Sequence, residues 1–257
     1  MRLFFIEESE LAGPNPAVRG VDARHIISVL RLKPGDRIGL FDGTGKRYEA
    51  RITAFSSGKV EVSVLGSSCP DVESPLELVV AQSFLKEKKM DDLVRMLTEL
   101  GISKWIPFIS ERSVPRPDDK RIIARTLRWE KIAKEAAKQC KRTRITRIGE
   151  MASFEEILAS EKDFDLKIVF WENEKNLLDQ KSLAAGHVNL KKILVMFGPE
   201  GGFAVNEIEK AKESGFITAG IGPRILKAET ATICACALIQ FLFGDMGKNL
   251  DKDEWLK

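Results

Sequence analysis

Two stretches of sequence decide the fold of this chain: Ile221-Gly-Pro-Arg-Ile-Leu-Lys-Ala-Glu-Thr-Ala-Thr232 and, upstream of it, Phe197-Gly-Pro-Glu-Gly-Gly-Phe203. Each stretch is a glycine-proline loop between an apolar run and a helical pattern. Two such strand-to-helix turns predict one backbone-lined pocket at the carboxyl edge of a sheet, which is where α/β folds bind ligands. Glycine lets backbone approach a ligand closely, and proline fixes the shape of a loop. We therefore expect the chemistry of the protein in this pocket.

The sequence around these loops alternates strand patterns with helical patterns. The expected strands are 76–81, 105–109, 167–171, 193–197 and 216–221, and the expected helices are 88–100, 121–140, 206–214 and 229–243. This alternation predicts an α/β domain with a parallel sheet and helices on its faces. The helix at 229–243 is apolar around its whole circumference, which indicates burial on several sides.

Residues 1–70 have the pattern of a small β domain. Short apolar runs at 3–6, 38–41, 48–54 and 60–65 predict strands, and Asp42-Gly43-Thr-Gly45 predicts a hairpin turn. Asp22 is expected to be the N-cap of a helix over 22–30. Strands at this spacing favour a small barrel. The proline-containing stretch Cys69–Pro75 marks a boundary, so we expect domains at 1–70 and 75–246 and a polar tail at 247–257.

Composition excludes several classes of protein. The chain has 257 residues, of which 44% are hydrophobic, enough for one large or two modest globular domains. No apolar run approaches the ~20 residues that a membrane span needs, and the N-terminus lacks the basic region and cleavage site of a signal peptide. We therefore expect a cytoplasmic protein. The four cysteines have no C-x-x-C spacing and lie far from both histidines, so no metal site is expected.

Positive charge is concentrated in one segment. Between Lys120 and Arg147 there are eleven Lys or Arg and two Glu, a net charge of +9, whereas the whole chain carries +3. Such asymmetry indicates a polyanion-binding surface, and the alternative is a solvated helix face.

The loop Gly198-Pro-Glu-Gly-Gly202 fits a phosphate group poorly. It lacks the G-x-G-x-x-G and Gly-Lys-Ser/Thr patterns, and Glu200 would repel an anion. A nucleotide-dependent enzyme is therefore disfavoured. A neutral or cationic ligand with hydrogen-bond donors suits the loop better, and a plain tight turn is the alternative.

The two loops together resemble the signature of the SPOUT class of RNA methyltransferases, and more closely that of the ribosomal small-subunit RNA methyltransferase E family. The similarity extends over residues 1–244. It is carried further by Arg24-His-Ile-Ile-Ser-Val-Leu-Arg-Leu32, Leu40-Phe-Asp-Gly43, Glu87-Lys-Lys-Met90, Glu99-Leu-Gly-Ile102, Ser110-Glu-Arg112 and Trp129-Glu-Lys-Ile132. The chain departs from the common family pattern at Ile221, where Leu is usual. It also departs at Lys227-Ala228, where Arg-Thr or Arg-Ala is common, so the planar fork of an arginine is missing there.

The resemblance implies a PUA-like β-barrel followed by a SPOUT-type parallel sheet with a deep trefoil knot. It also implies a homodimer that uses S-adenosyl-L-methionine to methylate N3 of a uridine in 16S ribosomal RNA of the small subunit. Carried over residue by residue, the expected cofactor contacts are Gly198, Glu200, Gly201, Gly202, Ile221, Gly222, Pro223, Ile225, Leu226 and Ala231. Trp171 is added from its position at the end of the preceding strand.

Chemistry assigns roles to further residues near the loops. Methyl transfer needs a nucleophile held in line with the methyl group, and uridine N3 must lose its proton as the bond forms. The nearest carboxylates are Glu200 and Glu229, and Arg224 is expected to stabilise negative charge on the base. The alternatives are helix capping by Glu229 and an ion pair between Arg224 and Glu200 or Glu229. N3 lies on the Watson–Crick edge, so the target base must be unpaired or flipped out.

The expected contacts to RNA phosphates are Arg24, His25 and Arg31 in the first domain and Arg142 and Arg144 in the basic segment. For His25 the alternative is a local structural contact. For the whole chain the alternative to an RNA methyltransferase is a non-catalytic ribosomal RNA-binding assembly factor. Binding of S-adenosyl-L-methionine distinguishes the two.

Overall fold

The computed structural model of the chain describes residues 1–86, 88–159, 164–178 and 190–247. The chain divides into two compact units. Unit 1 consists of Met1–Glu73 and Lys134–Ile145, and unit 2 consists of Ser74–Ala133 and the chain from Thr146 onward. Helix α4 (Asp119–Cys140) therefore contributes its last two turns to unit 1, which the sequence did not predict. The polar tail expected at 247–257 lies outside the described residues except for its first residue.

Unit 2 is built on a seven-stranded parallel sheet with the order β12-β10-β11-β6-β7-β8, in which β9 also pairs with β7. The strands are β6 (Glu77–Ser83), β7 (Lys104–Ile109), β8 (Arg147–Ile148), β9 (Ala152–Ser153), β10 (Leu166–Phe170), β11 (Lys192–Phe197) and β12 (Ile217–Ala219). Strands β6 and β11 are buried almost throughout, as expected for parallel strands covered on both faces. The predicted α/β domain with a parallel sheet is confirmed.

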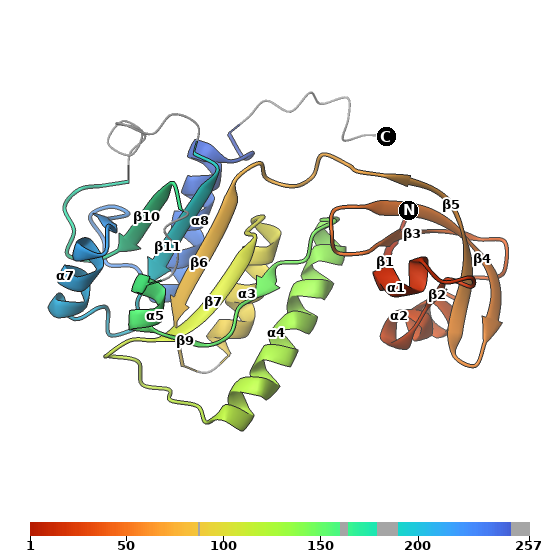
Figure 1. Cartoon of the computed structure of the whole chain (residues 1–257), viewed down its shortest axis with the longest axis horizontal. Coiled ribbons are helices and arrows are strands. Elements are labelled where there is room, and N and C mark those ends of the chain that lie inside the picture. Colours follow the sequence, from red (N-terminus) through yellow and green to blue (C-terminus); the bar gives the residue numbers. More distant parts are fainter. Residues whose placement is uncertain (87, 160–163, 179–189, 248–257) are drawn as a thin grey trace. The chain divides into compact units, whose positions relative to one another are not determined.

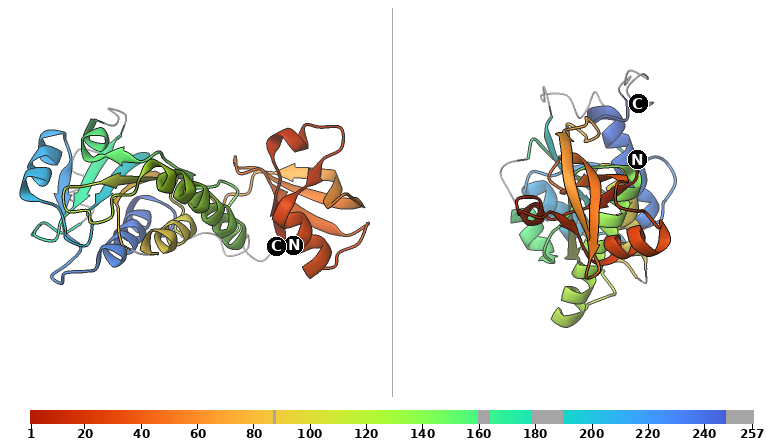
Figure 2. Two further views of the ribbon diagram at one scale, coloured as in Figure 1. Left: turned by 90° about the horizontal axis from the view of Figure 1, so that it is seen from below. Right: turned by 90° about the vertical axis from the view of Figure 1, so that its right-hand side faces the viewer.

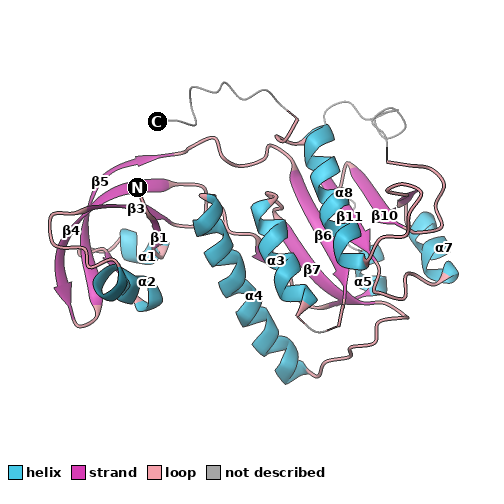
Figure 3. Cartoon of the chain, turned by 180° about the vertical axis from the view of Figure 1, so that it is seen from behind, coloured by secondary structure: helices cyan, strands magenta, loops and turns pink. Residues whose placement is uncertain are grey.

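Helices cover both faces of this sheet. Helices α5 (Phe154–Ala159) and α7 (Val205–Glu213) lie in front of it in Figure 1, whereas α3 (Lys89–Glu99) and α8 (Ala228–Phe243) lie in front of it in the opposite view of Figure 3. The left view of Figure 2 shows both layers. Below α5 and α7 the core includes Phe108, Phe154, Met196 and Phe203. In the described ranges, no helix combines the length and apolar composition needed to cross a membrane.

Helix α8 is not buried on all sides. Ala235, Cys236 and Ile239 are buried against the sheet and α3, but Leu238 is 41% exposed and Phe241 is 60% exposed. One apolar face of this helix is thus uncovered in the single chain.

Unit 1 contains a five-stranded sheet with the order β1-β3-β4-β5-β2. The strands are β1 (Leu3–Phe5), β2 (Ala17–Val18), β3 (Arg37–Phe41), β4 (Arg47–Ser56) and β5 (Lys59–Ser68). β1 and β3 are parallel, and the remaining pairs are antiparallel. The hairpin turn predicted at residues 42–45 connects β3 to β4 and is confirmed. The core of unit 1 includes Phe4, Ile26, Ile38, Leu40 and Ile52.

The helical part of unit 1 differs from the prediction. After α1 (Glu8–Leu11), the second helix begins at Gly20 as α2 (Gly20–Arg24) and continues as a π-helical turn, η1 (His25–Val29). The prediction of Asp22 as an N-cap is wrong, because Asp22 lies inside the first turn. Its buried carboxylate instead accepts a hydrogen bond from the backbone N–H of Phe5 at 3.0 Å and pairs with Lys138.

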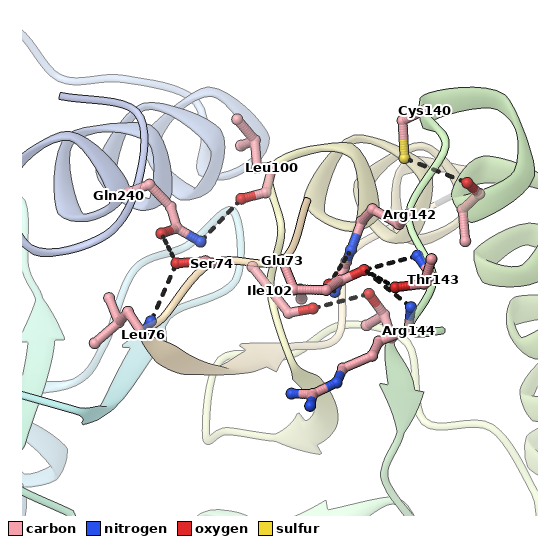
Figure 4. A network of polar contacts seen from close by, with 12 residues as sticks. Glu73, Ser74, Leu76, Leu100, Ile102, Cys140, Arg142, Thr143, Arg144 and Gln240 are labelled. Carbon is pink, nitrogen blue, oxygen red and sulfur yellow. Dashed lines mark hydrogen bonds and ion pairs between the residues drawn. The ribbon is translucent and has the colours of Figure 1, made fainter. Parts of the chain in front are cut away.

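A buried ion pair fastens the segment 134–145 to the end of the N-terminal part of unit 1. The guanidinium of Arg142 donates to Glu73 Oε2 from Nε at 3.0 Å and from Nη2 at 2.9 Å (Figure 4). Glu73 Oε1 accepts from the backbone N–H groups of Thr143 and Arg144. We therefore correct the expectation that Arg142 contacts RNA phosphates. Its side chain is only 7% exposed, and reaching a phosphate would leave Glu73 buried and unpaired.

Candidate functional site

A cavity of about 470 Å³ lies in unit 2 at the carboxyl ends of β10, β11 and β12. Its floor is formed by Phe170, Phe197 and Ala219, which are in register as the last residues of the three strands. The rings of Phe170 and Phe197 stack with centroids 4.9 Å apart and an interplanar angle of 3°. The loops that follow β11 and β12 line the walls, so the two glycine-proline loops share one pocket, as predicted.

The structure places nearly all the expected cofactor contacts on this cavity. It is lined by Trp171, Gly198, Glu200, Gly201, Gly202, Ile221, Gly222, Ile225, Leu226 and Ala231. Pro223 is the exception: it is exposed and is not among the lining residues. Pro223 restricts the loop without facing the cavity, because the ring of a proline constrains its own backbone. Ile225 lines the rim and is 84% exposed.

Two of the loop glycines have backbone conformations that L-residues rarely adopt. The φ angle of Gly202 is +66°, and that of Gly222 is +129°. Gly201 does not share this feature, and a Cβ added there would make an ordinary 3.5 Å contact with Arg112 Cβ. The same arginine donates from Nη1 to the carbonyl oxygen of Gly201 at 3.0 Å, which fixes the loop from outside the cavity.

A cluster of three charges stands at one side of the cavity, which Lys89 and Glu200 line and Glu229 does not. Lys89 Nζ lies 3.0 Å from Glu200 Oε1 and 3.5 Å from Glu229 Oε2. The hydrogen bond to Glu200 is the main cause of the raised pKa of Lys89. Burial of Glu200 opposes ionisation, but hydrogen bonds from the backbone N–H of Lys86 and from Lys89 outweigh it, so the pKa of Glu200 is lowered. Glu200 is therefore ionised and poorly suited to accept a proton.

Glu229 differs from Glu200 in its surroundings. Its Oε2 is buried and makes no hydrogen bond to the described residues, and Lys89 is its partner by charge. Glu229 is the second residue of α8, whose N-cap is Lys227, and no side chain makes a cap hydrogen bond there. The alternative of Glu229 as a capping residue is thus wrong, although its place in the first turn of α8 agrees with the other part of that alternative, pairing with the helix dipole.

Arg224 is exposed and lines the cavity from the loop after β12. In the part of the chain that the structure describes, no ion pair joins Arg224 to Glu200 or Glu229, because Lys89 occupies that position. Sequence reasoning missed Lys89 and also Glu172, which lines the cavity two residues after β10. The position of Glu172, two residues after the end of a parallel strand, is a signal that could have found it.

The residues expected to contact RNA lie in unit 1. Arg24, Arg31 and Arg144 are exposed, and Arg31 has a φ of +52°, which is uncommon for a non-glycine residue. His25 is half-buried and meets the ring of Phe4 edge-on at 6.2 Å, which agrees with a structural contact. Figure 4 shows Arg144 beside the buried pair of Glu73 and Arg142.

Many cations of the basic segment already have partners. Within unit 2, Arg128 pairs with Asp91 at 2.6 Å. Within unit 1, Lys138 pairs with Asp22 and Glu135, and Lys134 Nζ lies 3.7 Å from the centre of the Phe5 ring. The net charge of +9 therefore overstates the number of cations available to a polyanion.

Comparison with known proteins places these features in a family. Residues 72–240 match the RNA methyltransferase domain, and residues 18–65 match the RNA methyltransferase PUA domain. Ribosomal RNA small subunit methyltransferase E of Bacillus subtilis is 33% identical over 247 residues, which cover 94% of this chain and 96% of that protein. The corresponding protein of Buchnera aphidicola subsp. Acyrthosiphon pisum is 31% identical and covers 86% of each chain.

Solved structures agree with this comparison. A ribosomal RNA small subunit methyltransferase E from Neisseria gonorrhoeae, crystallised with bound S-adenosyl methionine, superimposes with a TM-score of 0.84. It is 31% identical, and the match covers 96% of this chain and 99% of that one. A Legionella pneumophila protein in complex with the bound cofactor SAM superimposes with a TM-score of 0.85 at 26% identity, over 95% of this chain and 98% of that one.

Proposed function

The chain belongs to the ribosomal RNA small subunit methyltransferase E family, and from this premise we propose that it transfers a methyl group from S-adenosyl-L-methionine to N3 of a uridine in 16S ribosomal RNA. The observation that carries the proposal is the cavity between the two glycine-proline loops, since the gonococcal relative with the same fold binds S-adenosyl methionine. We place this activity in the cytoplasm, on the small ribosomal subunit or its RNA.

The residues of the cavity fit this cofactor. Its volume of about 470 Å³ lies in the range of small-ligand sites, ~300–1,000 Å³. The stacked rings of Phe170 and Phe197 and the loop glycines offer an apolar floor and close backbone approach. Glu172 and Glu200 suit a cationic ligand, and the absence of a phosphate-loop sequence disfavours a nucleotide. Bound there, the cofactor supplies an activated methyl group on a sulfonium.

The protein's own residues have to orient the base and manage the N3 proton. Of the two expected proton acceptors, we propose Glu229, because the carboxylate of Glu200 is already engaged by two hydrogen bonds and has a lowered pKa. Glu229 Oε2 makes no hydrogen bond to the described residues, and its nearest charge is Lys89 Nζ at 3.5 Å. Arg224 lines the cavity as an exposed cation that pairs with no carboxylate of the described residues, and it stabilises the negative charge that appears on the uracil oxygens.

Nucleoside mass spectrometry tests the proposed reaction. Small-subunit RNA from cells that lack this gene is incubated with the purified chain and isotope-labelled S-adenosyl-L-methionine. We expect labelled 3-methyluridine at a single site. A label on another atom or base would still support methyltransferase activity but would overturn the assignment to N3. RNA binding without labelling and without calorimetric binding of the cofactor would instead favour the non-catalytic assembly factor.

We further propose that exposed arginines of unit 1 hold the RNA backbone. Arg24→Glu and Arg144→Glu should each weaken RNA binding to a similar degree for all sequences. Each should also reduce the slope of log affinity against log salt by about 1, because each removes one phosphate contact. The measurement is a salt titration by fluorescence anisotropy. Arg95→Glu is the control, since Arg95 is an exposed arginine of α3 that pairs with Asp92. Equal salt slopes in all three variants would contradict the assignment.

The homodimer is also a proposal. Leu238 and Phe241 form an exposed apolar face on α8, beside a groove lined by Ile221, Leu226, Cys234 and Ala237. We propose that a second copy covers this face, because large exposed apolar patches mark interaction sites. Sedimentation velocity should show a dimer for the natural chain and a monomer for Phe241→Asp. An active monomer of the natural chain at micromolar concentration would refute it.

We propose the trefoil knot because the chain belongs to this family. One connection in the sheet, which crosses β10, agrees with it. The chain leaves β11, passes through α7 and enters β12 on the far side of β10. There Gly220 donates its N–H to Asn176 at 2.8 Å and accepts from Leu178 at 3.0 Å, so the segment after β10 is bound to the end of β12. A crystal structure that traces residues 166–243 without a threaded crossing would overturn it.

A further inference from the structure

A fully buried glutamine lies behind the cavity rather than on it. Gln82 is the penultimate residue of β6 and has no exposed surface. It is in register with Phe197, whose ring forms part of the cavity floor. A polar side chain in the centre of a parallel sheet is costly unless its hydrogen bonds are made, so the partners of this amide show what it holds together.

The partners come from β6 itself, from the loop after β11 and from α8. Gln82 Nε2 donates to the carbonyl oxygen of Gly198 at 3.2 Å and to that of Ser83 at 3.0 Å. Gln82 Oε1 accepts from Thr232 Oγ1 at 2.7 Å. Gly198 begins the loop after β11, and the fully buried Thr232 lies in the first turns of α8, next to the cavity residue Ala231.

The orientation of this amide follows from its neighbours. Carbonyl oxygens only accept hydrogen bonds, so the side of the amide that faces Gly198 and Ser83 must be the NH₂ group. The oxygen is then left for the hydroxyl of Thr232, which also lies 2.9 Å from the carbonyl oxygen of Ala228. No water or alternative partner is needed to satisfy the amide.

We propose that Gln82 is a positioning residue that locks the loop after β11 to the N-terminal turns of α8 and so fixes the width of the cofactor cavity. This inference rests on the proposed function for the identity of the ligand, but the lock itself does not depend on it. The loop after β11 and α8 are separate in sequence, and the amide of Gln82 joins them through one side chain on a third element, β6. A preformed cavity binds more tightly, because less order must be gained on binding.

The chain contains a matched control at the other end of α8. Gln240 is also fully buried; its Nε2 donates to the carbonyl oxygen of Leu100 at 3.0 Å, and its Oε1 accepts from Ser74 Oγ at 2.7 Å (Figure 4). Gln82 on β6 and Gln240 on α8 therefore make the same kinds of hydrogen bond, one near each end of α8. Of the two, Gln82 bonds to a loop of the cavity and Gln240 does not. A general loss of stability should therefore weaken cofactor binding in variants of either glutamine, whereas a loss of positioning should weaken it only in the Gln82 variant.

Calorimetry with S-adenosyl-L-methionine compares Gln82→Met with Gln240→Met. Methionine keeps the approximate volume of the side chain and removes its hydrogen bonds. We expect similar losses in melting temperature, because each variant leaves buried polar partners unsatisfied. We expect the dissociation constant to rise about tenfold or more for Gln82→Met and less than about twofold for Gln240→Met. Equal changes in affinity would overturn the proposal and leave Gln82 a purely structural residue.

Two substitutions of Thr232 test the same hydrogen bond from its other side. Thr232→Ser keeps the hydroxyl and should keep the affinity, whereas the near-isosteric Thr232→Val removes it and should follow Gln82→Met. A Val variant with natural affinity would contradict the lock.

Hydrogen exchange separates this proposal from the proposed function. The backbone amides of Gly198, Glu200, Gly201 and Gly202 should exchange faster in Gln82→Met than in the natural chain or in Gln240→Met, without any cofactor present. Unchanged exchange at these amides overturns the lock. If the natural chain binds no S-adenosyl-L-methionine, the proposed function fails, and the exchange experiment still decides the lock.

Discussion

Replacing Gly202 or Gly222 by valine is expected to reduce S-adenosyl-L-methionine binding by at least about 100-fold while the fold survives. Both glycines line the cavity and have positive φ angles, +66° and +129°. A β-branched residue is strained in such conformations by ~1–3 kcal/mol, so the loop relaxes to another backbone path and moves the cavity wall. At Gly202 the new side chain would also displace the carboxylate of Glu172. Isothermal titration calorimetry measures the affinity, and circular dichroism measures the fold.

Gly201→Ala is the control for these variants. Gly201 lines the same cavity but has no positive φ, and an added Cβ would meet Arg112 at an ordinary contact distance of 3.5 Å. Its affinity should change by less than about threefold, because neither strain nor overlap arises. Natural affinity in both valine variants would show that the loop conformation does not shape the cofactor site. A loss as large in Gly201→Ala would show that any side chain in the loop is harmful, whatever its backbone angle.

The parallel sheet was predictable because its long elements have clear periodicity. In α3, Met90, Leu93, Val94 and Leu97 are buried at helical spacing, and β6 and β11 are continuous apolar runs. Strands β8 and β9 have two residues each and α5 has six, which is too short for a periodic pattern, and none was predicted. The addition of residues 134–145 to unit 1 depends on the pair of Glu73 and Arg142, 69 positions apart in sequence, which no local pattern reveals.

The sequence predicted which loops form the candidate site but not which side chains form ion pairs there. Glycine and proline spacing, together with the family resemblance, indicated nine residues that line the cavity, and the position of Trp171 after its strand indicated a tenth. The pairing of Lys89 with both Glu200 and Glu229 was missed, because it joins the start of α3 to the distant loop after β11 and to the first turn of α8. The expectation for Arg142 was wrong because composition counts a cation but does not show whether a buried carboxylate, here that of Glu73, already neutralises it.

The structure also bears on whether Arg224 stabilises charge on the base or forms a structural ion pair. An ion pair with Glu200 or Glu229 would have made it a structural residue, and Lys89 fills that role instead. Arg224→Ala is therefore expected to reduce the single-turnover rate of methylation by about 100-fold or more. The reason is that a fixed cation stabilises negative charge appearing on the uracil in the transition state. Cofactor affinity and melting temperature should change little, because Arg224 is exposed and makes no ion pair with the described residues.

Lys227→Ala separates a specific effect of Arg224 from a general effect of positive charge at the cavity. Lys227 lines the same cavity three residues further along the same loop and is also exposed. If the cavity needs only positive charge, both alanine variants should lose rate to a similar extent, and Arg224→Lys should recover most of it. If the planar guanidinium of Arg224 stabilises the base, Lys227→Ala should stay within about threefold of the natural rate and Arg224→Lys should recover only part of the loss. A natural rate in Arg224→Ala, or a large fall in its melting temperature with a small loss of rate, would remove Arg224 from the chemistry.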